Sequence, residues 1–156
     1  MQVKTPRPPR LKSNGSYRNG STRKKSTPDN HGAGLAELRG RLGAIEQSLA
    51  VAEHDLNGTL LSANARYLAL TGYTLEEVQH RPHSVQVAPA EREGEVYQRF
   101  WRELKEGKPQ AGDYKRLKKD GKEIWLRASY QPVPDAQGNP VKIVEIATDW
   151  TEQHKI

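Results

Sequence analysis

The chain has 156 residues, of which 34% are hydrophobic and 28% are charged, and it contains no cysteine. This length allows one ordinary domain with some unpacked sequence, and the absence of cysteine excludes disulfides, thiolate nucleophiles and cysteine-based metal sites. No apolar stretch approaches the roughly 18 residues that cross a bilayer, and the basic N-terminus lacks the apolar run of a secretory signal, so we expect a cytoplasmic protein that does not span a membrane.

The formal net charge of +6 comes from residues 1–33, which contain eight basic residues and one acidic residue, whereas 17 basic and 18 acidic residues remain in the rest of the chain. This segment has almost no apolar side chain to bury, so we predict a disordered basic tail. Basic tails can bind nucleic acid, but this one has a single aromatic residue, Tyr17, and no regular spacing. We therefore expect no nucleic-acid partner.

Residues 34–48 are predicted to form an amphipathic helix. Its apolar residues recur at steps of three and four, which places them on one stripe, and they are Leu35, Leu38, Leu42, Ile45 and Leu49. Gly40 and Gly43 weaken the helix by about 1 kcal/mol each, so it needs a partner surface. Two partners are open: a second subunit in a short coiled-coil seam, or an exposed sheet face of the same domain.

Two strands and two short helices follow. The strands, 51–56 and 59–62, flank Asn57-Gly58, a turn pair in which both residues tolerate positive φ. The helices are predicted at 64–70 and 74–78. In the second, Thr74 and Glu77 have the spacing of a capping box.

A longer helix over residues 90–106 is predicted after Pro89, with Gly107 to end it. The remainder reads as strands at 113–118, 123–131 and 141–150, the first two joined by an Asp120-Gly121 turn. The last strand is apolar on both faces, which predicts cover on both faces. The sequence therefore predicts an α+β fold: a five-stranded antiparallel sheet with helices inserted between strands two and three, preceded by the amphipathic helix.

Five motifs in register resemble the PAS family, and in particular the PAS domains of bacterial chemotaxis and aerotaxis receptors. These motifs are Asp55–Asn64 (D-x-x-G-x-x-x-x-A-N), Leu70–Val78 around Gly72-Tyr73, Phe100–Gly107 (F-W-x-x-L-x-x-G), Lys119–Pro132 (K-D-G-x-x-x-W-x-x-A-x-Y-x-P) and Asp149–Glu152 (D-x-T-E). The resemblance covers residues 49–153, which we take as a PAS domain.

The resemblance implies a ligand cavity between the sheet and the inserted helices. In flavin-binding members a histidine follows a proline after the second short helix and a tryptophan lies on the long helix, positions that His83 and Trp101 occupy here. Asn64 is a further pocket candidate. FAD is the first cofactor the resemblance suggests, haem with His83 or His80 as axial ligand is the second, and no cofactor at all remains open. As alternatives, Trp101 can be a core aromatic and His83 a loop histidine.

No phosphate-binding loop, dinucleotide-type glycine loop or nucleophile elbow occurs, so we expect no enzyme activity. His80 and His83 have no nearby carboxylate in the sequence, so we expect no metal site. Two functions remain. One is a sensor of redox state, oxygen or a small ligand that relays its state to a partner. The other is a cofactor-free module for dimerisation or protein docking.

Overall fold

The fold is described from a computed structural model that places residues 30–155. Most of the predicted basic tail, residues 1–29, lies outside the described residues. The first helix, α1 (Asn30–Ser48), begins ahead of its predicted start at residue 34. The apolar stripe that supported the prediction begins only at Leu35, so the pattern could not mark the first turn.

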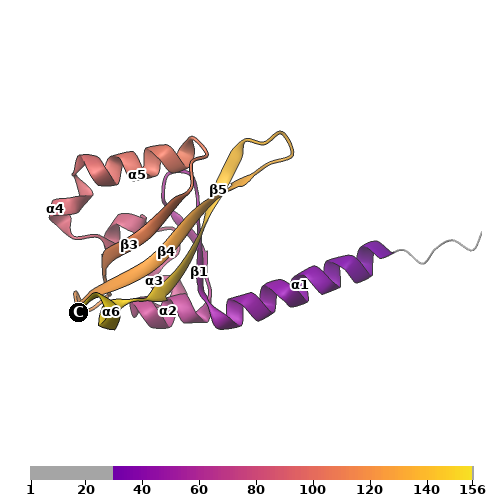
Figure 1. The fold of residues 1–156 in the computed structure, drawn as a ribbon, viewed down its shortest axis with the longest axis horizontal. Coiled ribbons are helices and arrows are strands. Elements are labelled where there is room, and N and C mark those ends of the chain that lie inside the picture. The colour runs from indigo at the N-terminus through magenta and orange to yellow at the C-terminus, as the bar shows by residue number, and fades with distance from the viewer. Residues whose placement is uncertain (1–29, 156) are drawn as a thin grey trace, which may run out of the picture.

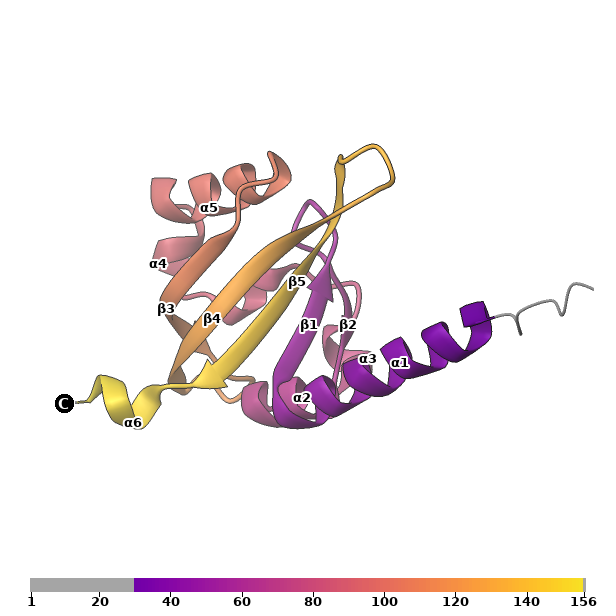
Figure 2. The same ribbon diagram turned by 45° about the vertical axis from the view of Figure 1, so that its right-hand side comes forward.

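Five antiparallel strands form one sheet in the order β2-β1-β5-β4-β3 (Figures 1 and 2). Their bounds are β1 (Ala50–His54), β2 (Leu60–Ala63), β3 (Gln110–Leu117), β4 (Glu123–Pro134) and β5 (Pro140–Asp149). The N-terminal strand β1 pairs with the C-terminal strand β5, so the start and the end of the domain meet in the middle of the sheet.

The helices between β2 and β3 lie over one face of the sheet (Figure 1), which confirms the predicted architecture. They are α2 (Ala65–Thr71), α3 (Leu75–Val78), the 3-10 helix η1 (His83–Gln86), α4 (Pro89–Arg92) and α5 (Glu95–Lys105). The predicted capping box is present, since the Thr74 side chain accepts from the Glu77 N–H and the Glu77 carboxylate accepts from the Thr74 N–H.

The single helix predicted over residues 90–106 is wrong, because the structure divides it into α4 and α5. Gly94 is extended, with φ −73° and ψ 152°, and its carbonyl accepts the first hydrogen bond of α5 from Gln98 N–H at 3.2 Å. Glycine has poor helix propensity and no side chain to hold the turn, so the chain changes direction there. The break separates α5 as a helix with its own orientation over β3 and β4.

The turn at Asn57-Gly58 also differs in detail from the prediction. Only Gly58 has positive φ, at 83°, and the Asp55 carboxylate accepts from Asn57 N–H and Thr59 N–H, both at 2.9 Å. This local hydrogen bonding fixes the loop without requiring Asn57 to enter the left-handed region. The turn is therefore longer than a two-residue hairpin but joins the predicted strands.

Helix α1 runs outward from the sheet in both ribbon views (Figures 1 and 2) and leaves its apolar stripe open. The exposed fractions of Leu35, Leu38, Leu42 and Ile45 lie between 46% and 58%. The alternative in which this helix covers the outer sheet face of its own domain is therefore excluded. None of the helices in the described part of the chain has the length and apolar character of a membrane span.

Candidate functional site

Glu145 lies at the centre of a polar cluster between the sheet and the inserted helices, and it is fully buried. Its carboxylate is within hydrogen-bond distance of three side chains: His54 Nε2 at 2.8 Å, the Tyr67 hydroxyl at 3.1 Å and the Tyr130 hydroxyl at 3.1 Å. The strand register brings them together, because Glu145 pairs with Ala52 of β1 and with Tyr130 of β4. Ala52 is small and leaves room for the cluster.

The number of available protons fixes the direction of each hydrogen bond in this network. An ionised carboxylate only accepts hydrogen bonds, so the Tyr130 hydroxyl donates its single proton to Glu145. The Tyr130 oxygen then accepts from Arg116 Nη2 at 3.3 Å and from His83 Nε2 at 3.3 Å. His83 Nδ1 is left as the acceptor for the Tyr97 hydroxyl at 2.9 Å. The connections therefore run from Glu145 through Tyr130 and His83 to Tyr97 on α5.

Burial shifts the acid–base behaviour of the cluster. It lowers the pKa of His83 well below its usual value, and the positive charge of Arg116 and the neighbouring His54 lower it further. His83 is therefore neutral near pH 7, as the proton assignment requires. Burial also raises the pKa values of Tyr67 and Tyr130 well above the usual value, with Glu145 adding to both, so both hydroxyls keep their protons.

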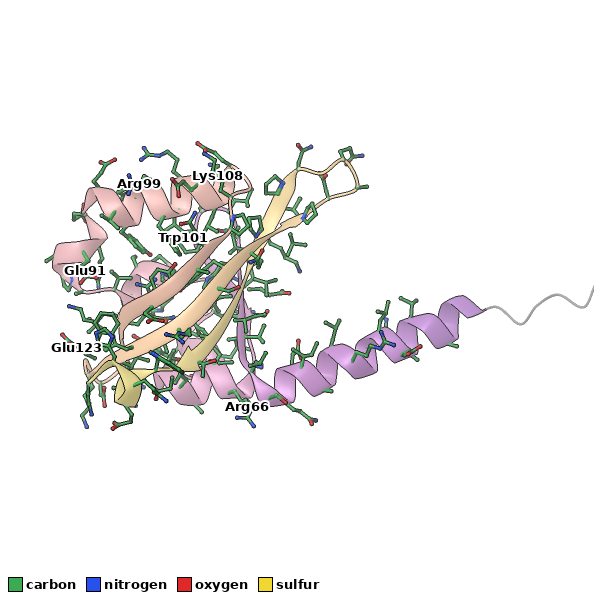
Figure 3. All side chains as sticks on the ribbon, viewed as in Figure 1. Arg66, Glu91, Arg99, Trp101, Lys108 and Glu123 are labelled. Atoms are coloured by element: carbon green, nitrogen blue, oxygen red, sulfur yellow. The ribbon has the colours of Figure 1, made fainter. Side chains whose placement is uncertain are left out.

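The structure brings His83 and Trp101 together, as the sequence predicted for a common pocket. Their ring centroids lie 5.4 Å apart in an edge-to-face arrangement, and Trp101 lies between α5 and the sheet (Figure 3). With Gly58 and Tyr97 they line a cavity of about 260 Å³ beside α5. A Cβ on Gly58 would lie 3.0 Å from Trp101 Cε2, so the indole packs against a turn that needs glycine for both space and φ.

Asn64 does not join them. It is the N-cap of α2, and its side-chain oxygen accepts from Tyr67 N–H and Val51 N–H, both at 3.0 Å. Its amide nitrogen donates to the carbonyls of Glu46 at 2.8 Å and Leu49 at 2.7 Å. All of these bonds are to backbone, so the geometry gives Asn64 the structural role of fastening α1, β1 and α2 and does not support a place in the pocket.

Most of the buried polar residues were not predicted. They are His54, Tyr67, Gln86, Arg116, Tyr130 and Glu145. The alternation of buried positions along the strands indicates two of them. His54 continues the buried positions 50 and 52, and Glu145 lies between the buried positions 143 and 147. A charged or polar residue on the buried face of a strand is the signal that would have found them.

Three buried polar atoms of this cluster make no hydrogen bond with any described residue: His54 Nδ1, Gln86 Nε2 and Arg116 Nε. Buried polar atoms are nearly always paired in folded proteins, and leaving one unpaired costs about 1–3 kcal/mol. These three atoms are hydrogen-bonding capacity that water or a bound group would satisfy.

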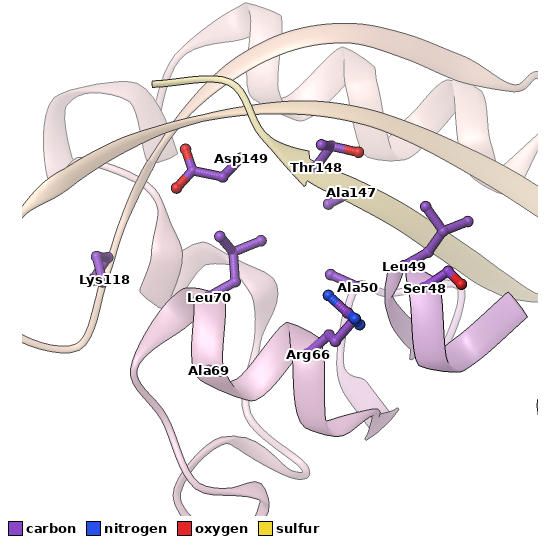
Figure 4. A pocket seen from close by; sticks show the side chains of 10 residues that line it. All are labelled: Ser48, Leu49, Ala50, Arg66, Ala69, Leu70, Lys118, Ala147, Thr148 and Asp149. Carbon is purple, nitrogen blue, oxygen red and sulfur yellow. The ribbon is translucent and has the colours of Figure 1, made fainter. Parts of the chain in front are cut away.

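A separate cavity of about 460 Å³ lies where α1 ends and α2 faces the end of β5 (Figure 4). Its charged lining residues are Arg66, Lys118 and Asp149, and Arg66 donates to the Gln47 carbonyl. It contains none of the residues predicted to bind a cofactor. No group of three or more metal-ligating side chains within residues 30–155 is placed to hold a metal ion.

The family profile described as "PAS fold" matches residues 60–147. The chain belongs to the PAS family. This PAS domain is 37% identical over 117 residues to the biofilm dispersion protein BdlA of Pseudomonas aeruginosa, covering 75% of the present chain and 28% of that protein. It is 33% identical over 79 residues to the aerotaxis receptor of Escherichia coli K12, covering 51% of the chain and 15% of the receptor. The chain therefore spans less than a third of either relative.

Solved structures agree with the fold of this PAS domain. An RNA-binding light-oxygen-voltage receptor matches with a TM-score of 0.65 and 23% identity, over 78% of this chain and 35% of that one. A PAS domain from Colwellia psychrerythraea matches with the same TM-score and identity, over 74% of this chain and 98% of that one. The predicted resemblance and the predicted fold are both confirmed.

Proposed function

We propose that this PAS domain is a sensor that does no chemistry of its own. It receives redox state, oxygen or a small ligand in the cavity lined by His83 and Trp101 and relays the change to a partner protein. The observation that carries the proposal is the Glu145 cluster: a connected, fully buried polar network with unpaired atoms, reached from that cavity through His83. A core that serves stability alone would place apolar side chains there.

The lining residues suit the flat ring of a flavin. Trp101 and Tyr97 supply aromatic neighbours, and His83, hydrogen-bonded to Tyr97, holds that side chain beside the cavity. The cavity of about 260 Å³ suits a ring-sized group better than a whole dinucleotide. Bound flavin would supply reversible electron transfer. The protein's part is to orient the ring and to present the protons of the Tyr130–His83–Tyr97 chain at fixed atoms. The resemblance to flavin-binding PAS domains makes FAD the first candidate, with only its isoalloxazine ring in this cavity.

The test is an absorption spectrum of the protein purified without added cofactor, followed by denaturation and identification of what is released. A flavin or haem band near one equivalent is the expected result. His83→Ala and Trp101→Ala should each weaken cofactor binding by about 10- to 100-fold, because each removes an oriented contact. His80→Asn, a change at an exposed histidine in the same segment, should keep full occupancy by flavin. Full occupancy in both pocket variants would show that the site is misassigned.

A second candidate, a cofactor-free dimerisation module, is favoured by the open stripe on α1. Its spacing is that of a short coiled-coil seam, and a second copy offers the same stripe in return. A colourless folded protein would exclude a flavin or haem sensor and would leave this candidate beside a sensor of a colourless small ligand.

We expect the double variant Leu38→Glu, Leu42→Glu to be monomeric at concentrations where the unmodified protein is a dimer, because burying two carboxylates in an apolar seam is unfavourable. Light scattering after size-exclusion chromatography measures the mass. Ala36→Glu with Gln47→Glu adds the same charge on the opposite side of α1 and should leave the dimer intact. A monomeric unmodified protein at every concentration would exclude the seam.

A further inference from the structure

A second cavity flanks α5 on the side away from the β1–β2 turn. Residues of α5 divide between the two cavities by helical spacing: Gln98 and Trp101 face the first, and Val96 and Phe100 face the second. Tyr97 stands between them and lines both. The second cavity measures about 370 Å³, within the range of small-molecule sites.

The floor of this second cavity holds Arg116 of β3, whose side chain is 5% exposed. Among residues 30–155, its hydrogen bonds go to the Lys115 carbonyl at 3.3 Å and to the Tyr130 hydroxyl at 3.3 Å. The guanidinium also lies 4.8 Å from the centre of the Tyr114 ring. Its Nε makes no hydrogen bond with a described residue. A guanidinium carries five N–H donors, so most of its capacity is unused.

A buried cation is costly unless an anion pairs with it, and the pairing that suits a guanidinium is a carboxylate held by two parallel hydrogen bonds. The described partners of Arg116 are a carbonyl and a hydroxyl, neither of which carries a full negative charge, and the guanidinium is linked to the buried Glu145 carboxylate only through the Tyr130 hydroxyl. The two acids at the rim of the cavity are engaged elsewhere. Glu91 pairs with Lys115 at 3.2 Å and Glu95 pairs with Arg102 at 3.3 Å. Arg116 is thus the charge that an incoming anion meets.

The other residues that line the cavity indicate which kind of group the ligand carries besides its anion. Phe100 is buried and Tyr97 is stacked parallel to it, with 9° between the ring planes and 6.3 Å between the centroids. Val96 at the mouth is 75% exposed, an apolar side chain without cover. These groups suit a flat apolar body. The two rim carboxylates disfavour a polyanion such as a phosphate ester.

We propose that the cavity between α5 and β3 binds a small aromatic carboxylate, with the carboxylate on Arg116 and the ring against Tyr97, Phe100 and Val96. This site is distinct from the cavity of His83 and Trp101, and its occupation does not depend on a cofactor there. The Arg116–Tyr130 hydrogen bond connects it to the Glu145 cluster, so an occupant acts on the same network from the other side of α5.

The experiment titrates the protein with benzoate and with benzamide, which has the same ring but no charge, and follows amide chemical shifts by NMR. Benzoate should bind saturably, with shifts centred on Val96, Phe100 and Arg116, and benzamide should bind at least about tenfold more weakly. Arg116→Gln should weaken benzoate about 10- to 100-fold and leave benzamide unchanged. Arg99→Gln, which removes an exposed arginine of α5, is the matched control and should bind benzoate like the unmodified protein (Figure 3).

A thermal melt checks that Arg116→Gln is folded. If it is not, Val96→Glu decides, because it adds a negative charge at the exposed mouth without disturbing the core. It should weaken benzoate binding more than Val96→Gln does, because both variants remove the apolar contact and only Val96→Glu adds the charge. Three results would each overturn the proposal. They are equal binding of benzoate and benzamide, unaltered benzoate binding by folded Arg116→Gln or by Val96→Glu, and no saturable benzoate binding. Unchanged cofactor occupancy in Val96→Glu would show that the two sites are separate.

Discussion

Replacing Glu145 by alanine should lower the free energy of unfolding by about 3–5 kcal/mol, the range found when one partner of a buried charged network is removed. The carboxylate accepts from His54, Tyr67 and Tyr130, and all four residues are fully buried. Without it, the His54 and Tyr130 donors lose their acceptor inside the core, and the Tyr67 hydroxyl keeps only Gln86 Oε1, at 3.0 Å. Arg116, which is linked to Glu145 only through the Tyr130 hydroxyl, also loses a negative charge in its surroundings.

Urea unfolding of the purified variant measures this effect. Glu145→Gln keeps the shape and one acceptor oxygen, so it should cost less, about 1–3 kcal/mol. Glu123→Ala, at an exposed position of β4, is the matched control and should change stability by no more than about 0.5 kcal/mol (Figure 3). If Glu145→Ala proved as mild as Glu123→Ala, the cluster would not hold a charged carboxylate.

The elements with strong local signals were predictable from sequence. The strands follow a period of two, the turns contain Asn57-Gly58 and Asp120-Gly121, and the capping box at Thr74 is a short-range pattern. The break at Gly94 was missed because Pro89 and the acidic residues after it have the pattern of a helix start, although the apolar spacing begins only at Val96. The spacing of apolar residues predicts which residues share a face of a helix. It does not predict where a glycine turns the chain between two short helices.

The candidate site depended on information of another kind. Glu145 meets His54 and Tyr67 across 91 and 78 residues of sequence, a separation that only the strand order and register close. Both faces of β5 have an apolar pattern in the sequence, so Glu145 on its buried face was not predicted as a site residue. His83 and Trp101 were paired through family resemblance, and the structure places them in contact. The same resemblance placed Asn64 in the pocket, whereas its capping geometry commits the side chain to backbone.

Acidification should weaken the fold through His83, and the sign follows from its lowered pKa. The folded state excludes a proton from this imidazole through burial, and Arg116 and His54 oppose the added charge. Tyr97, Tyr130 and Glu145 are the other titratable groups that face the ring, and only Glu145, 4.0 Å from Nε2, favours its protonation. The unfolded chain binds the proton below about pH 6.5, so this contribution to stability is complete above that pH and is lost as the pH falls toward the lower folded pKa.

The expected slope is at most about 1.4 kcal/mol per pH unit between the lower folded pKa and about pH 6.5. Urea unfolding at several pH values measures it in the unmodified protein and in His83→Gln, which should lack this part of the pH dependence. His80→Gln removes an exposed histidine and should retain it. Parallel pH profiles for the unmodified protein and His83→Gln would mean that His83 binds a proton in the folded state as readily as in the unfolded state. The hydrogen bonds that run from Glu145 to Tyr97 would then contain a charged His83. A flatter profile for His83→Gln alone would place a neutral imidazole at the point where the buried network meets the cavity.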